Sequence, residues 1–268
     1  MKKGYDFIVQ GKDFNSPDAV VDLGVGKNMV ASIRYWLRVF GICDANKPTE
    51  LGNYLFSENN GKDKYIEDLA TLWLLHFNLV FLEEASLYNM FFCGLQRERS
   101  KFEREQVVTY AKLKLVEAGK QSVFNENTMR KDVAVLLQNY SLPRKPQSNE
   151  DFSSLLIDLD LIRQSSEGKG YYFNTDGKRK VTKEIFLYGL LKLKEKEGDN
   201  TISFDTIQER IGLLFCMQDL ETIEMLKQLT SEYGQHIAYS DVAGIKQVQF
   251  TKDLDVEQVL NDYYGTNV

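Results

Sequence analysis

Apolar residues recur at helical spacing between residues 27 and 40. Five of them fall at positions i, i+4, i+7, i+8 and i+11 and so share one face of a predicted helix: Met29, Ile33, Trp36, Leu37 and Phe40. The opposite face carries cations and small residues. Gly41 directly follows this pattern, and glycine readily adopts the left-handed conformation that ends helices, so we expect the helix to stop there.

Turn-forming residues flank this predicted helix on both sides. Gly24 and Gly26 bracket a tight turn before it, and residues 18–23 form a predicted short preceding helix. Residues 43–48 combine Asp, Asn, Lys and Pro, a composition typical of turns, before order resumes at Thr49. Two helices followed by a polar wing-like segment indicate a winged helix-turn-helix. We predict this domain over residues 1–60, with the motif itself around Leu23 to Phe56.

The next part of the chain predicts a helical core and connector over residues 61–141. Residues 71–94 are apolar and aromatic almost throughout, which favours buried central helices. We expect the lone His76 in this run to be a core residue rather than a ligand. Cations from Arg97 to Arg104 alternate with glutamates, a pattern typical of a solvated, salt-bridged helix.

The C-terminal part predicts an α+β region over residues 150–268 with winged-helix-like units. Residues 142–149 contain two prolines and form the best candidate for a linker. A polar turn at 165–170 leads into a strand at 171–173, and several surrounding cations form a second contact surface or a merely solvated one. Helices follow from Lys183, from Asp205 to Ile211 and over 220–233, before a terminal hairpin over 237–250.

The fold class predicted from these patterns is therefore α+β and mainly helical. A winged helix-turn-helix forms the N-terminal domain, and one or two further winged-helix-like units surround a central helical core. Two or three small domains fit a chain of 268 residues, which exceeds the usual single-domain size.

The net charge limits how this chain can bind nucleic acid. With a formal charge of -6 and a pI near 5.2, it cannot coat DNA indiscriminately, so any DNA contact must be local. In a helix-turn-helix the second helix enters the major groove, while lysines and arginines on the helix and the wing hold phosphates. The candidate DNA-binding residues are therefore Lys27, Asn28, Arg34, Arg38 and Lys47.

Two other interpretations of the same segment stay open. An amphipathic helix with cations on its solvated face also occurs in proteins that never touch DNA. Winged helices also serve as protein–protein interaction modules, and the acidic pI favours this use. The alternative function is therefore a scaffold that binds a modification or nuclease subunit without direct DNA contact.

The sequence contains no recognisable catalytic or metal-binding pattern. A GVGKN string resembles a phosphate-binding loop, but Val21 replaces its first glycine and Asn28 replaces its Ser or Thr. Three distant cysteines without a CxxC pair disfavour a disulfide framework and a zinc site: Cys43, Cys93 and Cys216. We expect no enzyme activity, no catalytic residues, no cofactor and no metal.

The location expected from the sequence is the cytoplasm, without membrane association. The first residues lack the apolar stretch of a signal peptide. The apolar run at 72–82 is shorter than the roughly 20 residues that cross a bilayer.

Several stretches of the chain resemble an uncharacterised bacterial family. The segments LGVGKNMVASIRYWLRVFGI, TELGNYLF, TLWLLHFNL, NTMRKDVAVLLQNY and SDVAGIKQVQF are similar to that family in the same order. The family is often encoded in DNA phosphorothioation and phage-defence gene clusters. The resemblance implies a DNA-modification or defence accessory, with duplex DNA and other proteins of such a cluster as partners.

Overall fold

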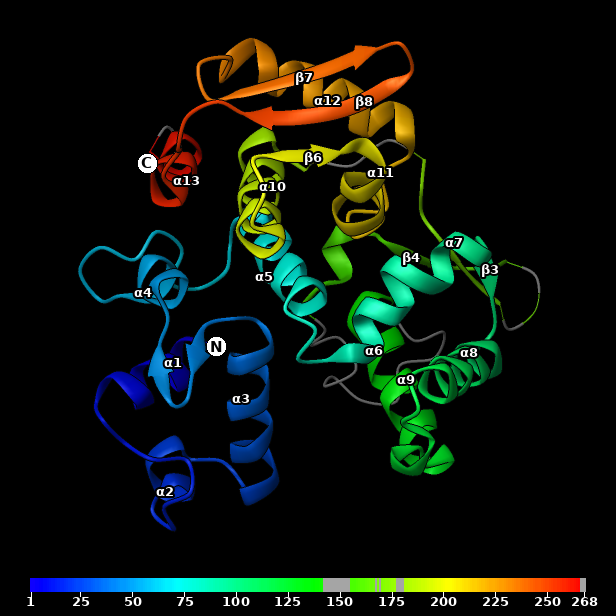
Figure 1. The fold of residues 1–268 in the computed structure, drawn as a ribbon. Helices are drawn as coiled ribbons and strands as arrows, with labels where there is room; N and C mark the ends of the chain where they lie inside the picture. Colours follow the sequence, from blue (N-terminus) through cyan, green and yellow to red (C-terminus); the bar gives the residue numbers. More distant parts are fainter. Residues whose placement is uncertain (142–154, 167, 169, 177–180, 266–268) are drawn as a thin grey trace. The chain divides into compact units, whose positions relative to one another are not determined.

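The computed structural model describes residues 1–141, 155–166, 168, 170–176 and 181–265 (Figure 1). The chain divides into two compact units, Met1–Ser86 and Leu87–Val268. The predicted linker at 142–149 lies outside the described residues, as do several cations of the basic middle region: Arg144, Lys145, Lys169, Lys178, Arg179 and Lys180. The predicted division into residues 1–60, 61–141 and 150–268 stays a prediction.

The first unit contains five helices and a short hairpin among its described elements. In chain order these are α1 (Lys2–Val9), α2 (Ala19–Leu23), α3 (Lys27–Val39), β1 (Cys43–Asp44), β2 (Lys47–Pro48), α4 (Glu50–Phe56) and α5 (Leu69–Phe81). The strands β1 and β2 pair antiparallel through Ala45 and Asn46, which both have positive φ, as tight hairpin turns require. The short helix, the long helix and the hairpin expected between residues 18 and 48 are all present.

The end of α3 is fixed at Gly41, as the sequence indicates. Gly41 has a φ of 69°, and its amide donates to the carbonyl of Arg38. Asn78 of α5 donates its side-chain amide to the Phe40 carbonyl at 2.9 Å. The Thr49 hydroxyl donates to the Gly41 carbonyl at 2.6 Å. These bonds satisfy carbonyls that a helix end otherwise leaves unpaired, and they fix where the hairpin begins.

The buried face of α3 differs in part from the predicted stripe. Val30 and Leu37 are buried and Ile33 is half-buried, but Met29 keeps 55% of its surface exposed. The prediction for Met29 is wrong because the buried stripe begins one residue later, at Val30. Helix α1, which the sequence analysis did not predict, lies against this face at Gly4. A Cβ on Gly4 would come within 2.5 Å of Ile33, so only glycine permits this approach.

The second unit begins with a helical segment that leads into a three-stranded sheet. Its elements are α6 (Ser86–Asn89), η1 (Met90–Leu95), α7 (Gln96–Glu98), β3 (Lys101–Phe102), α8 (Arg104–Glu117), η2 (Gln121–Val123), α9 (Glu126–Tyr140), η4 (Ile157–Leu159), β4 (Ile162–Gln164) and β5 (Tyr171–Phe173). The predicted single basic helix is wrong, because Arg99 is extended and β3 separates α7 from α8. Phe102 pairs with Tyr171 in the sheet, and this extended segment separates the two helices.

The rest of the second unit contains a second three-stranded sheet. Its elements are α10 (Lys183–Glu197), β6 (Thr201–Ser203), α11 (Phe204–Ile207), η5 (Gln208–Gly212), α12 (Asp219–Glu232), β7 (Ile237–Val242), β8 (Ile245–Phe250) and α13 (Val256–Tyr264). The terminal hairpin is present as predicted. Ser203 rather than Asp205 caps the helix that follows β6, because its hydroxyl accepts from the Thr206 amide.

The two sheets share one topology. Their strand orders are β3-β5-β4 and β6-β8-β7, both antiparallel, so the last strand of each set lies between the other two. Both sets follow the order helix, strand, two helices, two strands (Figure 1). We call residues 2–48 the first module, 86–173 the second and 183–250 the third. The fold is thus α+β and mainly helical, as expected.

Candidate nucleic-acid interface

The five predicted site residues lie exposed on α3 and on the hairpin of the first module. Lys27, Arg34 and Arg38 are separated by seven and four residues, so they form one stripe along α3. Asn28 lies beside this stripe, and Lys47 lies on β2. Helix α3 contains no acidic residue, so the stripe forms a continuous row of positive charge.

Arg34 connects α3 to the loop between α1 and α2. Its Nη1 donates to Asn15 Oδ1 at 2.8 Å. Asn15 in turn donates its backbone and side-chain amides to Asp13, both at 3.0 Å. The hairpin residue Asn46 reaches the same Asp13 oxygen at 3.4 Å. This chain of hydrogen bonds holds Arg34 through a neutral amide, so the guanidinium keeps its charge and further donors for a phosphate.

Arg38 lies near the strand β1 and forms one ion pair. Its Nε is 3.4 Å from Glu84 Oε2, and both side chains are about half exposed. Such exposed pairs contribute little to stability, so a phosphate can replace Glu84 at low cost. Burial raises the pKa of the Cys43 thiol, the charge of Asp44 raises it further, and Arg34 and Arg38 lower it. The positive charges of both arginines therefore reach Cys43, where the hairpin begins.

Lys27 and Lys47 are the free cations of this surface. Both are exposed, and neither forms an ion pair with another residue in the described ranges. Lys47 lies one residue after the positive-φ turn residue Asn46, which places it beside the tip of the hairpin. The link between the helix and the hairpin in the described residues is Asp13, which accepts from Asn46 of the hairpin and from Asn15, the partner of Arg34.

A second exposed stripe on α3 was not predicted from the sequence. Asn28, Ser32 and Tyr35 are spaced by four and three residues and are all exposed, with Tyr35 keeping 39% of its surface. Amide, hydroxyl and aromatic side chains of this kind are suited to base edges rather than phosphates. The helical spacing of Ser32 and Tyr35 from Asn28 is the sequence signal that indicates this stripe.

Acidic residues limit the reach of this positive surface. Asp13 and Asp44 lie next to the arginines, and Lys12 pairs with Asp22 of α2 at 3.1 Å. The potential is therefore positive along the α3 stripe and the hairpin tip, but not over the whole module. This agrees with the expectation that any phosphate contact must be local.

The described residues contain no cluster of side chains that could hold a metal ion. Within the ranges that the structure covers, no group of three or more His, Cys, Asp or Glu side chains could hold a metal ion. His76 is fully buried in α5, 6.0 Å from the Trp73 ring, which confirms it as a core residue. Among the helices in the described parts of the chain, none is long and apolar enough to cross a membrane.

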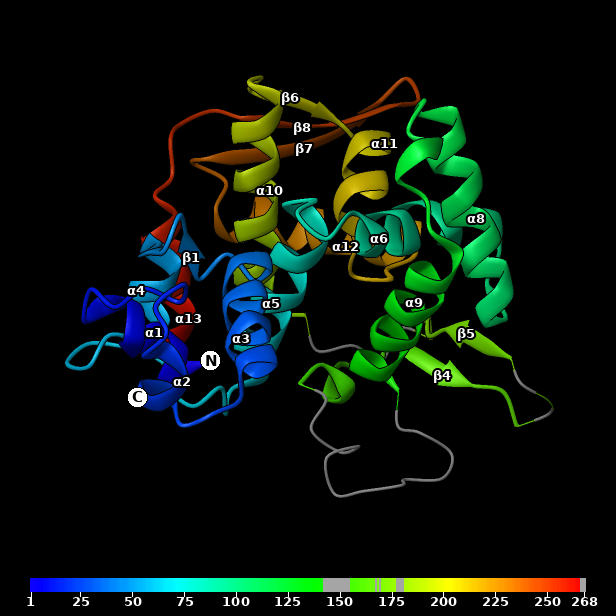
Figure 2. The ribbon, with the colours of Figure 1, turned by 90° about the horizontal axis from the view of Figure 1, so that it is seen from below.

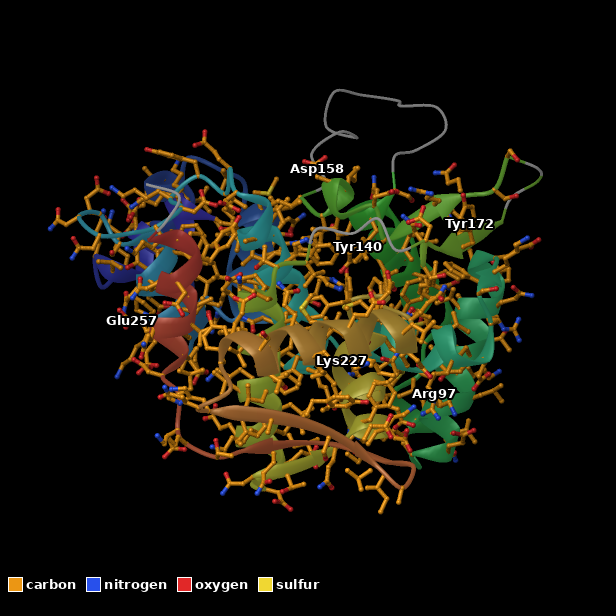
Figure 3. All side chains as sticks on the ribbon, turned by 90° about the horizontal axis from the view of Figure 1, so that it is seen from above. Arg97, Tyr140, Asp158, Tyr172, Lys227 and Glu257 are labelled. Carbon is orange, nitrogen blue, oxygen red and sulfur yellow. The ribbon has the colours of Figure 1, made fainter. Side chains whose placement is uncertain are left out.

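The corresponding helices of the other two modules carry different charges. Helix α9 has two cations and two acidic residues, and Arg130 forms ion pairs with Glu126 and Glu105. Helix α12 has one cation, Lys227, and four acidic residues (Figure 3). Of these three helices, α3 alone carries cations without an acidic residue.

Comparisons with known proteins identify both a similar fold and a family. The structure is similar to a magnesium ion-bound SspB crystal structure, with a TM-score of 0.83, 23% identity, and coverage of 98% of this chain and 84% of that chain. A second SspB crystal structure has a TM-score of 0.82 and 24% identity over the same shares. At these identities the likeness establishes the fold alone. A search of curated proteins found no match. The sequence matches a family described as "Protein of unknown function (DUF4007)" over residues 1–264, and the chain therefore belongs to the DUF4007 family.

Proposed function

We propose that this chain is a non-catalytic DNA-binding accessory protein of a bacterial DNA-modification system of the phosphorothioation type, or of a phage-defence system. The first module acts as a winged helix-turn-helix. In this arrangement α3 enters the major groove, and Lys27, Arg34 and Arg38 contact phosphates on one side of it. The hairpin with Lys47 serves as the wing.

The observation that carries this proposal is the uniform charge of α3 in an otherwise acidic chain. Its three cations form one stripe without an acidic neighbour on the helix, while the whole chain has a formal charge of -6. Each cation that contacts a phosphate of a duplex releases a condensed counterion, and this release increases the affinity for DNA.

Two further observations support the proposal. The second and third modules share one strand order, in which the first strand of the set pairs with the last, and this order is compatible with winged-helix units. The sequence segments quoted above resemble a family found in phosphorothioation and phage-defence gene clusters. Membership of the DUF4007 family and the SspB-like fold are compatible with that setting.

The test is the affinity of the full chain for a short fluorescent duplex, measured by anisotropy over a range of salt concentrations. If Lys27, Arg34, Arg38 and Lys47 each meet a phosphate, log Kobs should fall against log[salt] with a slope of about -3.6. Arg34→Glu combined with Arg38→Glu should lower the affinity by at least about 30-fold and reduce the slope by about 1.8.

The matched control is Lys120→Glu combined with Lys252→Glu. Both lysines are exposed and lie outside α3 and its hairpin, and the change in total charge is identical. The control should keep most of the affinity. If both double variants weaken binding equally, or if the wild-type chain binds no duplex at low salt, direct DNA binding is wrong.

The non-catalytic part of the proposal has its own test. One of the similar SspB structures is bound to a magnesium ion, so the DNA substrates should be incubated with the protein and Mg²⁺. We expect supercoiled plasmid and labelled duplex to stay intact. Nicking that depends on Mg²⁺ and co-purifies with the folded chain would replace the accessory role with a nuclease role.

A scaffold function is the second candidate, and the acidic exposed face of α12 favours it. In that case the chain binds a modification or nuclease subunit and does not contact DNA itself. Co-purification with a subunit encoded beside it, together with no duplex binding by the isolated chain at low salt, would support the scaffold over the DNA-binding accessory.

A further inference from the structure

The third module presents an apolar and acidic surface at the position where the first module presents cations. Helix α12 precedes the β7–β8 hairpin just as α3 precedes the β1–β2 hairpin. On its exposed side, Leu220 keeps 73% of its surface and Glu224 is also exposed. The carboxylates beside this leucine repel phosphate groups. The exposed leucine itself can be buried against an apolar side chain of another protein.

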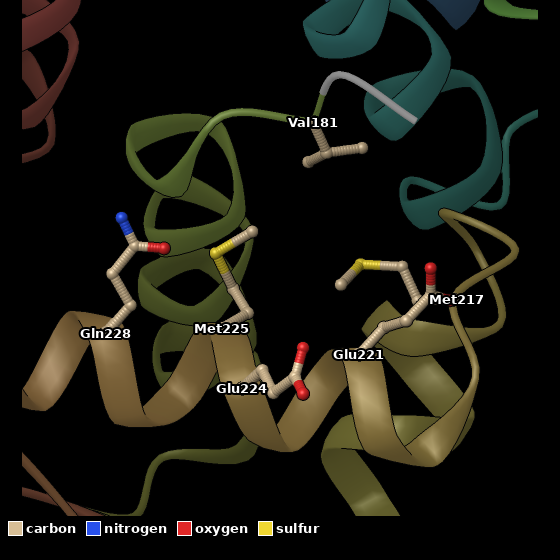
Figure 4. A pocket seen from close by; sticks show the side chains of 6 residues that line it. All are labelled: Val181, Met217, Glu221, Glu224, Met225 and Gln228. Atoms are coloured by element: carbon tan, nitrogen blue, oxygen red, sulfur yellow. The ribbon is translucent and has the colours of Figure 1, made fainter. Parts of the chain in front are cut away.

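An open pocket lies along one flank of α12. Its cavity volume is about 210 Å³, and it is lined by Val181, Met217, Glu221, Glu224, Met225 and Gln228. Figure 4 shows the side chains of Val181, Met217 and Met225 converging on it from three separate segments. Methionine side chains are flexible and polarisable, so such a pocket accommodates an apolar side chain of another protein.

The carboxylates at this pocket give it a negative rim. Glu224 is exposed and forms no ion pair with another residue in the described ranges. Glu221 accepts a hydrogen bond from the Gln218 amide, which caps the helix but leaves its negative charge. Across the whole helix, Lys227 alone opposes four acidic residues. This rim attracts lysine and arginine side chains and repels DNA.

The hairpin of the third module adds an apolar tip. Val242 and Ile245 pair across the turn Ala243–Gly244 and keep 70% and 65% of their surfaces exposed. The nearest strand cation, Lys246, lies 5.5 Å from the centre of the Phe204 ring. At about 1.5 Å per helical residue and about 3.3 Å per strand residue, α12 and β7 have similar lengths. Since β7 runs back alongside α12, the hairpin tip lies toward the end of the helix where α12 begins (Figure 1 and Figure 2).

We infer that this surface docks a basic segment of a partner protein, with an apolar side chain in the Met217–Met225 pocket and lysines or arginines against Glu221 and Glu224. We call it the α12 docking surface and define it by Met217, Leu220, Glu221, Glu224 and Met225. The inference concerns a site separate from α3 and does not depend on DNA binding. It gives the chain a protein contact in addition to the proposed DNA contact.

The test uses the full chain with ¹³C-labelled methionine methyl groups and two synthetic peptides. One peptide is an amphipathic helix with leucines at helical spacing flanked by lysines, and the other replaces each lysine with glutamate. The lysine peptide should shift the methyl signals of Met217 and Met225 but not that of Met29. It should bind at least about tenfold more tightly than its acidic twin, because like charges at a contact oppose association.

Variants locate the contact. Glu224→Lys should abolish the preference for the lysine peptide, and Met225→Ser should weaken its binding about tenfold by removing apolar contact. Glu197→Lys is the matched control, since Glu197 is exposed at the end of α10 and lies outside the surface. This control should leave the preference unchanged.

Three results would overturn the inference. Equal binding of both peptides would exclude charge complementarity. Met225 signals that shift with protein concentration alone would show that a second copy occupies the surface. Duplex DNA that shifts Met217 and Met225 would show a nucleic-acid site instead. Because duplex bound at α3 should shift Met29 in the same sample, failure of the proposed DNA function and failure of this inference give different signals.

Discussion

Helices α3 and α12 occupy the same place in the order of elements but present opposite faces to solvent. Each is followed by a hairpin and buries an apolar stripe, with Leu37 fully buried in one and Leu229 in the other. Yet α3 carries three cations and no acid, whereas α12 carries four acids and one cation. The buried side of a helix fixes its place in a module, while the exposed side selects the partner. Similar topology therefore does not imply a shared ligand.

The two helices are also fixed to their hairpins in comparable ways. The carbonyls at the end of α3 accept hydrogen bonds from Asn78 and Thr49. In α12 the Thr230 hydroxyl accepts from the Tyr239 amide of β7 at 2.9 Å. In the first module the bond from Thr49 joins the end of α3 to the residue directly after the hairpin, and in the third module the bond joins α12 to β7. The exposed faces of α3 and α12 therefore differ in the charge of their side chains and not in how firmly each helix is held.

The largest expected effects come from removing the buried anchors. Leu37→Ala and Leu229→Ala should each lower the free energy of unfolding by about 2 to 5 kcal/mol, because both leave a cavity at a fully buried site. Urea denaturation monitored by circular dichroism measures this. At a temperature where both variants are folded, Leu37→Ala should also weaken duplex binding and Leu229→Ala should not. Equal DNA binding by both would break the assignment of α3.

Single charge reversals on the two exposed faces should give unequal effects on duplex affinity. Arg34→Glu and Glu224→Lys change the charge by the same amount with opposite sign. Arg34→Glu should weaken binding about tenfold, while Glu224→Lys should change it less than about twofold, because salt screens charges beyond about 10 Å. Anisotropy titrations at one fixed ionic strength give both numbers. A strong gain from Glu224→Lys would mean that α12 also lies at the duplex.

Glycine substitutions test how tightly the end of α3 is fixed. Gly41 has a φ of 69°, and a Cβ there would lie 2.7 Å from the Asn78 side chain. Gly198, which follows α10, has a φ of 70° but has no neighbour within 4 Å of such a Cβ. Gly198→Ala should cost about 1 kcal/mol and Gly41→Ala about 2 kcal/mol, from left-handed strain without and with a clash. Equal melting temperatures would argue against the Asn78 contact.

The smallest expected effect is a pH dependence at α12. Lys183 lies against Glu232, and this hydrogen-bonded ion pair lowers the pKa of the Glu232 carboxyl and raises that of Lys183. A depressed carboxyl pKa contributes stability above the unfolded value, near 4.5, and that stability is lost as the pH falls through the folded value. Since both side chains are partly exposed, the contribution should stay below about 1 kcal/mol.

Glu232→Gln tests this effect. At pH 7 the variant should be slightly less stable than the wild-type chain, and the difference should vanish once the pH has fallen below the lowered pKa of folded Glu232, where both carry a neutral side chain. Thermal melts at several pH values measure it. A difference that is independent of pH would show that Glu232 acts through packing rather than through charge.

The sequence predicted local features well and non-local ones poorly. The stop at Gly41, the hairpin after it and the terminal hairpin follow from short-range backbone preferences, and all are present. The sequence missed helix α1 and the strand β3. The pairing of Phe102 with Tyr171 joins residues nearly seventy positions apart, and no periodicity in either segment indicates it.

The candidate interface likewise contains local features that the sequence predicted and non-local features that it did not. Lys27, Arg34, Arg38 and Lys47 were identified from residue type and helical phase, and the structure places all four in the first module as exposed residues. Met29 was predicted to be buried, but the buried stripe of α3 begins at Val30, and α1 packs at Ile33 and Leu37. The link from Arg34 through Asn15 to Asp13 could not be foreseen, since loop conformation decides it.

The sequence by itself determined that α3 forms, where it stops, and the charge that its exposed face carries. Those properties depend on residues within a few positions of each other, which share backbone preferences and helical phase. Only the tertiary structure decided that Asn46 of the hairpin and Asn15, the partner of Arg34, meet at Asp13, and that Met217 and Met225 form a pocket with acidic neighbours. Such surfaces depend on how separate segments pack, and that packing follows from the sum of many long-range contacts.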